Sequence, residues 1–155
     1  MWPFSKKRAP AIKLPAGDGC WSILQGENNG MPLLIRVDTA AKRPERHMRL
    51  PIRLGIAIPL HSPNELGLPE KAEAEQLSAI EDRLDDAIGA SGDMVLIITN
   101  AGMREFVSYV ASAQIAQQIV ARVCNATPSH EVQHYIESDP EWMVYGEYKK
   151  LCKTN

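Results

Sequence analysis

The 155-residue chain lacks the features that define several classes of protein. Its three cysteines are odd in number and form no C-x-x-C pair, so they predict neither a disulfide framework nor a cysteine zinc knuckle. No run approaches the roughly 20 apolar residues of a membrane span, and no apolar segment follows the charged start as in a secretory signal. Glycine-rich phosphate loops and a G-x-S-x-G elbow are also missing. We therefore expect reduced thiols, no cofactor and a cytoplasmic location.

The near-neutral net charge of −2 hides two unequal halves. Residues 1–69 carry 10 basic and 5 acidic side chains, whereas residues 70–155 carry 7 basic and 14 acidic ones. Nine of the 11 prolines also lie in the first half, which favours strands and loops there and helices in the second half. Residues 1–18 show no periodicity and predict a flexible basic tail, followed by a single domain over residues 19–155.

The strands are expected in pairs. Residues 21–25 and 33–38 flank a glycine- and asparagine-rich loop and predict a hairpin, and residues 94–99 and 104–111 predict a second one. Residues 52–60 are apolar at nearly every position, as in a strand that is covered on both faces. A last strand is expected near residues 131–136.

Three helices are expected in the second half. Leu77, Ile80, Leu84 and Ile88 form one apolar stripe on a helix that begins near Pro69. A second helix is expected from Ser112, a suitable N-cap, to just before Pro128, and a short third one over residues 141–151. The predicted fold is α+β: an antiparallel-rich sheet with two long helices packed on one face plus a short C-terminal helix.

One motif suggests metal chemistry. His130-Glu131-Val132-Gln133-His134 matches H-E-x-x-H, in which two histidines one helical turn apart bind zinc and the glutamate acts as general base. The surrounding residues alternate as in a strand, where positions i and i+4 lie about 13 Å apart and cannot share an ion. A zinc-dependent hydrolase that uses His130, Glu131 and His134 is therefore the alternative hypothesis, and an exposed strand edge is the simpler interpretation.

A basic segment suggests a third hypothesis. The loop over residues 42–53 could hold phosphates, as in an RNA-binding accessory protein, or it could bind an acidic protein surface. Against nucleic acid stand an aromatic content of only 6% and an acidic second half. Attraction between the basic and acidic halves of two copies is an equally physical option. The basic residues of this patch are Lys42, Arg43, Arg46, Arg49 and Arg53.

Short landmarks along the chain together resemble a known family. They are Trp21, Ile35–Asp38, Leu54–Ile56, Gly67–Pro69, Ile80–Asp82, Gly102–Phe106, Asp139–Trp142 and Tyr145. In this order and spacing, over about residues 20–151, they resemble the bacterial domain-of-unknown-function family 695. The resemblance implies no established activity. Some relatives are joined to a domain similar to the ribonuclease E regulator B family, which implies a regulatory or protein-binding role. Paired histidines are not part of the family pattern, and the basic loop and tail lie outside it.

Polar and aromatic residues beside turns are the candidates for a binding site. Arg104 and Glu105 open a strand just after Gly102, and Asp139, Trp142 and Tyr145 lie at the last strand-to-helix corner. An architectural role is the alternative for each: a side-chain ion pair, a helix cap or a place in the core. We expect a non-enzymatic module that binds a protein partner or itself. The candidate binding residues are Arg104, Glu105, Asp139, Trp142 and Tyr145.

Overall fold

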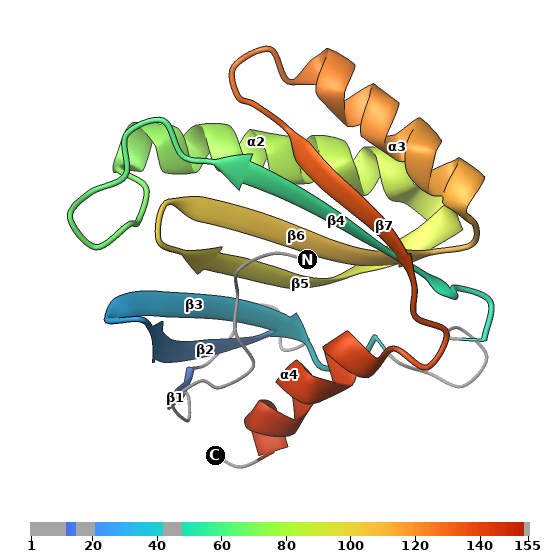
Figure 1. The fold of residues 1–155 in the computed structure, drawn as a ribbon, viewed down its shortest axis with the longest axis horizontal. Coiled ribbons are helices and arrows are strands. Elements are labelled where there is room, and N and C mark those ends of the chain that lie inside the picture. Colours follow the sequence, from blue (N-terminus) through green and yellow to red (C-terminus); the bar gives the residue numbers. More distant parts are fainter. Residues whose placement is uncertain (1–11, 15–20, 42–47, 154–155) are drawn as a thin grey trace.

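A computed structural model describes residues 12–14, 21–41 and 48–153, and these form one antiparallel sheet with three helices. The sheet has seven strands in the order β1-β2-β3-β5-β6-β4-β7, so β7 closes one side (Figure 1). The strands are β1 (Ile12–Leu14), β2 (Trp21–Asn28), β3 (Met31–Asp38), β4 (Ile52–Pro59), β5 (Gly92–Asn100), β6 (Met103–Val110) and β7 (Gln133–Ser138). The helices are α2 (Lys71–Ile88), α3 (Ala113–Ala126) and α4 (Met143–Lys153), with the short 3-10 turn η1 (Gly89–Ser91) after α2.

Both predicted hairpins are present and share one kind of turn. Asn29 and Gly30 join β2 to β3 with φ angles of 54° and 80°, and Ala101 and Gly102 join β5 to β6 with 49° and 81°. Two consecutive positive φ angles match the twist of a tight hairpin, and asparagine and glycine adopt them at little cost. β4 then pairs with β6 and β7 on its two sides, and its residues from Arg53 to Ile58 are buried on both faces of the sheet, as its nearly continuous apolar run predicted.

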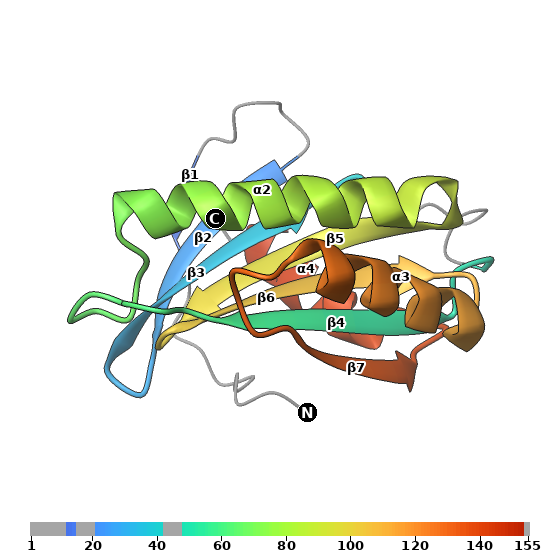
Figure 2. The ribbon, with the colours of Figure 1, turned by 90° about the horizontal axis from the view of Figure 1, so that it is seen from above.

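The two helices α2 and α3 cover the same face of the sheet (Figure 2). Leu77, Ile80 and Leu84 of the predicted stripe are fully buried in the cluster that contains the β4 residues Leu54, Ile56 and Ile58. The side chain of Ser112 accepts a hydrogen bond from the Ile115 N–H, so it caps α3 as expected.

The third helix, α4, packs on the opposite face, over the β2–β3–β5 side of the sheet. Trp142, at the entrance to α4, stacks on Tyr109 of β6 with the ring centres 4.2 Å apart. The Trp142 Nε1–H donates to the Leu50 carbonyl, and the Tyr145 hydroxyl donates to the Asp38 carbonyl. This side of the sheet therefore has its own aromatic core.

The α+β class, the antiparallel sheet and the three helices confirm the predicted architecture. The expectation of two long helices is met only in part. α2 has 18 residues, whereas α3 has 14 and is closer in length to α4, which has 11. Of the predicted flexible tail, residues 1–11 and 15–18 lie outside the described residues, and Ile12–Leu14 form β1. Among the described residues, no helix is long and apolar enough to cross a membrane.

Candidate functional site

The neighbours Arg104 and Glu105 lie on opposite faces of the sheet, because successive strand residues alternate. The Arg104 Nε donates to Thr99 Oγ1 at 2.9 Å on the face covered by α2. Burial and the positive charge of Arg36 lower the pKa of Arg104, with Glu81 acting in the other direction. Glu105 shares the other face with Tyr109, so Arg104 does not belong to one site with the remaining candidates.

Asp139 lies at the corner between β7 and α4, where its carboxylate contacts four groups. Oδ1 accepts from the Met143 N–H at 2.8 Å, and Oδ2 accepts from the Val144 N–H, so the side chain caps α4. Oδ2 also accepts from the Tyr109 hydroxyl at 2.7 Å and from Arg53 Nη1 at 2.8 Å. Burial acts to raise the pKa of Asp139, but these donors outweigh it and hold the pKa below its ordinary value.

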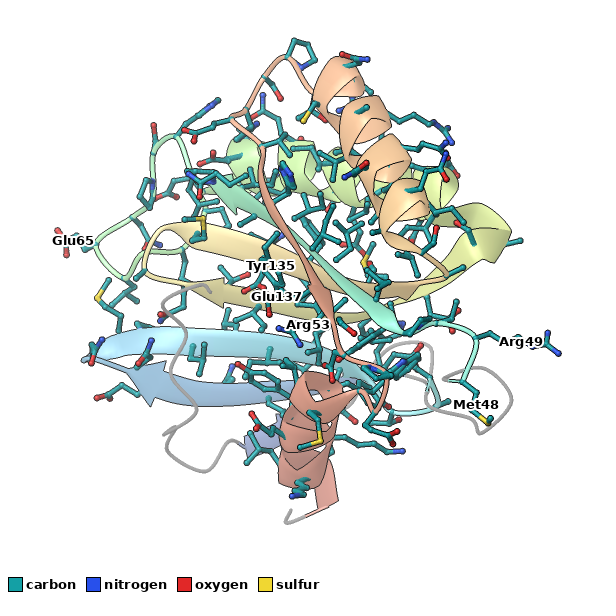
Figure 3. All side chains as sticks on the ribbon, turned by 45° about the vertical axis from the view of Figure 1, so that its right-hand side comes forward. Met48, Arg49, Arg53, Glu65, Tyr135 and Glu137 are labelled. Atoms are coloured by element: carbon teal, nitrogen blue, oxygen red, sulfur yellow. The ribbon has the colours of Figure 1, made fainter. Side chains whose placement is uncertain are left out.

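Arg53 does not belong to the exposed basic patch that the sequence predicts for residues 42–53. It lies in β4, and only 6% of its side chain is exposed. Its guanidinium bonds to Asp139 on one side and to Glu137 on the other, and it lies 5.6 Å from the centre of the Tyr135 ring. Figure 3 shows Arg53 beside Tyr135 and Glu137, whereas Arg49 points away from the sheet. Of the other basic residues, Lys42, Arg43 and Arg46 lie outside the described residues.

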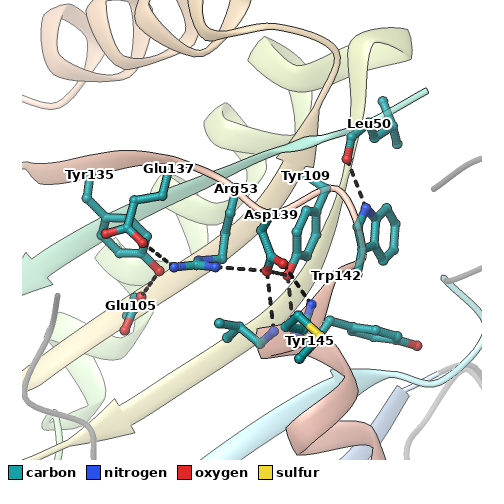
Figure 4. Close-up of polar contacts among 11 residues, drawn as sticks. Leu50, Arg53, Glu105, Tyr109, Tyr135, Glu137, Asp139, Trp142 and Tyr145 are labelled. Carbon is teal, nitrogen blue, oxygen red and sulfur yellow. Dashed lines mark hydrogen bonds and ion pairs between the residues drawn. The ribbon is translucent and has the colours of Figure 1, made fainter. Parts of the chain in front are cut away.

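Tyr135 connects this arrangement to Glu105. Its hydroxyl donates to Glu105 Oε2 at 2.6 Å, and burial holds the pKa of Tyr135 above its ordinary value, so the phenol stays protonated. Burial raises the pKa of Glu105 to about 7, although Tyr135 and Arg53 favour the charged form. The contacts run without interruption from Glu105 through Tyr135 and Arg53 to Asp139 and α4 (Figure 4).

This raised pKa predicts a stability that depends on pH. Because the folded chain favours neutral Glu105, its stabilising contribution is complete below about pH 4.5 and is lost as the pH rises through about 7. Replacing Glu105 with glutamine should remove this dependence. The difference in free energy of unfolding between wild type and Glu105→Gln should fall by about 2 to 3 kcal/mol from pH 5 to pH 8. Urea unfolding at both pH values measures this difference, and a constant difference would contradict the prediction.

Trp142 and Tyr145 serve the core. Both are fully buried, and their rings meet edge to face at 5.6 Å. Trp142 has a φ of 53°, a conformation that a bulky residue rarely adopts. The Tyr109 stack and the bond to Leu50 fix this conformation. The architectural alternative considered for Asp139, Trp142 and Tyr145 therefore describes their contacts.

The paired histidines do not form the predicted zinc motif. His134 lies in β7 opposite Ile56 and is exposed, whereas His130 lies before the strand with its side chain fully buried. The motif needs both histidines on one helix, but His134 lies in a strand and His130 lies outside it, so the zinc site predicted for His130, Glu131 and His134 is wrong. His130 instead meets Glu73, with Nε2 2.7 Å from Oε2, and its ring stacks on His61 at 3.8 Å.

Glu73 is the acid that sequence reasoning missed. It lies in the first turn of α2 and accepts the N–H groups of His61 and Ser62 at 2.6 and 3.2 Å. Burial acts to raise the pKa of Glu73, but these N–H groups and His130 hold it below its ordinary value. A signal was present, because Glu73 lies four residues before Leu77 and thus on the apolar stripe, where a carboxylate needs a partner.

Comparison with known proteins places the chain in a family. A family model described as a family of unknown function, DUF695, matches residues 20–148, and the chain belongs to this family. No curated protein matches the chain. The sequence resemblance is therefore confirmed.

Proposed function

We propose that this member of DUF695 is a non-enzymatic protein-binding module that acts in the cytoplasm and binds a second copy of itself through the outer edge of β7. The observation that carries the proposal is the position of β7, which pairs with β4 on one side and ends the described sheet on the other. An edge strand offers a row of main-chain donors and acceptors to another strand.

The direction of these groups follows from the register. The Asp139 N–H donates to the Pro51 carbonyl at 2.8 Å, so in this antiparallel pair the odd-numbered residues of β7 direct their main chain toward β4. The even-numbered residues His134, Ile136 and Ser138 therefore direct their N–H and C=O groups outward. A second antiparallel strand centred on Tyr135 would gain about four main-chain hydrogen bonds from His134 and Ile136.

The side chains of β7 suit pairing with a copy of the same strand. In a two-fold arrangement centred on Tyr135, Gln133 lies opposite Glu137 of the second copy, which places an amide donor opposite a carboxylate. Tyr135 lies at the axis, and its ring lies over Gly55 of its own sheet, away from the partner strand. No acidic side chain within the strand then faces another, so self-association carries no like-charge penalty there.

A location with reducing conditions also fits the cysteines. Cys124 lies exposed on α3 and Cys152 lies buried on α4, on opposite sides of the sheet. These two residues cannot form a disulfide with each other in this fold. The reducing conditions of the cytoplasm keep such thiols reduced.

Proline at His134 tests the proposed edge. His134→Pro removes an outward N–H without removing a bond to β4, so the monomer should fold, while dimerisation weakens at least about tenfold. His134→Ala loses the same ring but keeps the N–H and should dimerise like the wild type. Sedimentation velocity over a concentration series gives the dissociation constants, and circular dichroism checks folding. A monomeric wild type at high concentration, or a His134→Pro variant that still dimerises, would contradict the proposal.

A further inference from the structure

A second cluster lies just before the start of β7 and combines three possible metal ligands. His61 follows β4, Glu73 lies in the first turn of α2, and His130 precedes β7. One ligand atom from each lies within 4.8 Å of the other two. Three separate segments of the chain thus bring two imidazoles and one carboxylate together.

The two buried ligands are held in a fixed orientation. His130 has 0% and Glu73 has 8% of its side chain exposed. Ser129 Oγ lies 2.9 Å from His130 Nδ1, which leaves Nε2 directed at Glu73 Oε2. The N–H groups of His61 and Ser62 fix the carboxylate of Glu73. An oxygen partner on the second ring nitrogen and main-chain donors on the carboxylate are the outer contacts by which proteins orient metal ligands.

The third ligand is the one that can move. His61 has 52% of its side chain exposed, and its Nδ1 lies 4.0 Å from Glu73 Oε2. Its ring lies almost parallel to that of His130, with 5° between the planes. Because the lone pair of an imidazole lies in the ring plane, two stacked rings cannot bind one ion, so His61 must turn when a metal enters. Bonds of roughly 2.0 to 2.2 Å also require Glu73 and His130 to separate by a few tenths of an ångström.

We propose that His61, Glu73 and His130 form a binding site for a divalent transition-metal ion such as Zn²⁺. Two imidazole nitrogens and one carboxylate oxygen match the donors that zinc accepts. The exposed position of His61 leaves the fourth position of a tetrahedral ion to water. His130 is thus a metal ligand, as the H-E-x-x-H motif suggested, but with partners from the β4–α2 segment instead of His134.

Titration of the full chain with Zn²⁺ tests the site. After treatment with a chelator, isothermal titration calorimetry should show one Zn²⁺ per wild-type chain. His61→Ala should weaken binding at least about tenfold, and this variant should fold because the ring is half exposed. His134→Ala is the matched control, since it removes the other histidine of the motif, and it should bind like the wild type.

A second measurement separates a metal site from a set of structural hydrogen bonds. Co²⁺ bound in place of Zn²⁺ should give the visible absorption of a tetrahedral nitrogen and oxygen site, and His61→Ala should abolish it. Absence of stoichiometric binding, unchanged affinity in His61→Ala, or an equal loss in His134→Ala would overturn the proposal. Failure of the metal site is distinguishable from failure of the dimer, because His134→Pro tests dimerisation by sedimentation and His61→Ala tests metal binding by calorimetry.

Discussion

Replacing Asp139 with alanine is expected to lower the free energy of unfolding by about 3 to 5 kcal/mol, because it leaves the buried Arg53 without its buried counter-charge. The same change removes the acceptor for the Met143 and Val144 N–H groups at the start of α4. It also removes the partner of the Tyr109 hydroxyl. A buried cation, a helix end and a buried phenol thus lose their partner at once. Urea unfolding monitored by tryptophan fluorescence measures the loss.

Two further variants separate the charge from the helix cap. Asp139→Asn keeps an acceptor oxygen for the Met143 N–H but carries no charge for Arg53, so most of the loss should remain if the ion pair dominates. Glu137→Gln removes the other carboxylate of Arg53, whose side chain is 41% exposed, and should cost less than about 1 kcal/mol. If Asp139→Ala lowers the free energy of unfolding no more than Glu137→Gln does, Asp139 is not the main counter-charge of Arg53.

Much of the fold is readable in the sequence because local patterns and burial agree in most elements. The stripe from Leu77 to Ile88 and the cap at Ser112 each follow from neighbours within one helical turn. The hairpin turns at Asn29 and Ala101 need only the two residues that adopt positive φ. The order of the strands in the sheet is not a local property, and the placement of β4 between β6 and β7 becomes visible only in the structure.

The candidate site shows the same division between local and long-range information. The corner at Asp139 could be predicted, because aspartate just before a helix is a preferred cap by type and position. Its pairing with Arg53, 86 residues away, could not, since a charged residue in an apolar run indicates a buried partner but does not identify it. The sequence draws attention to His130 because His134 follows it four positions later. In the structure, however, the contacts of His130 are Glu73 and His61.

Gly55 of β4 gives the second large expected effect, and its cause is the ring that crosses it. Tyr135 lies opposite Gly55 in β7, and the Cβ of any larger residue at position 55 would fall within that ring. Gly55→Ala must therefore displace Tyr135, which breaks its hydrogen bond to Glu105 and its contact with Arg53. We expect a loss of about 2 to 3 kcal/mol in the free energy of unfolding, typical of overpacking.

A double variant identifies the ring as the cause of this loss. With Tyr135→Ala already present, Gly55→Ala should cost at least about 1 kcal/mol less than in the wild type, because the space is then open. Gly146→Ala is the control: no atom lies within 4 Å of its added Cβ, and alanine in α4 should stabilise by up to about 1 kcal/mol. Equal costs of Gly55→Ala with and without the ring would show that backbone conformation, not Tyr135, requires glycine. If the costs differ as expected, Gly55 is the residue that lets an aromatic ring of the edge strand lie flat on the sheet, between Glu105 and Arg53.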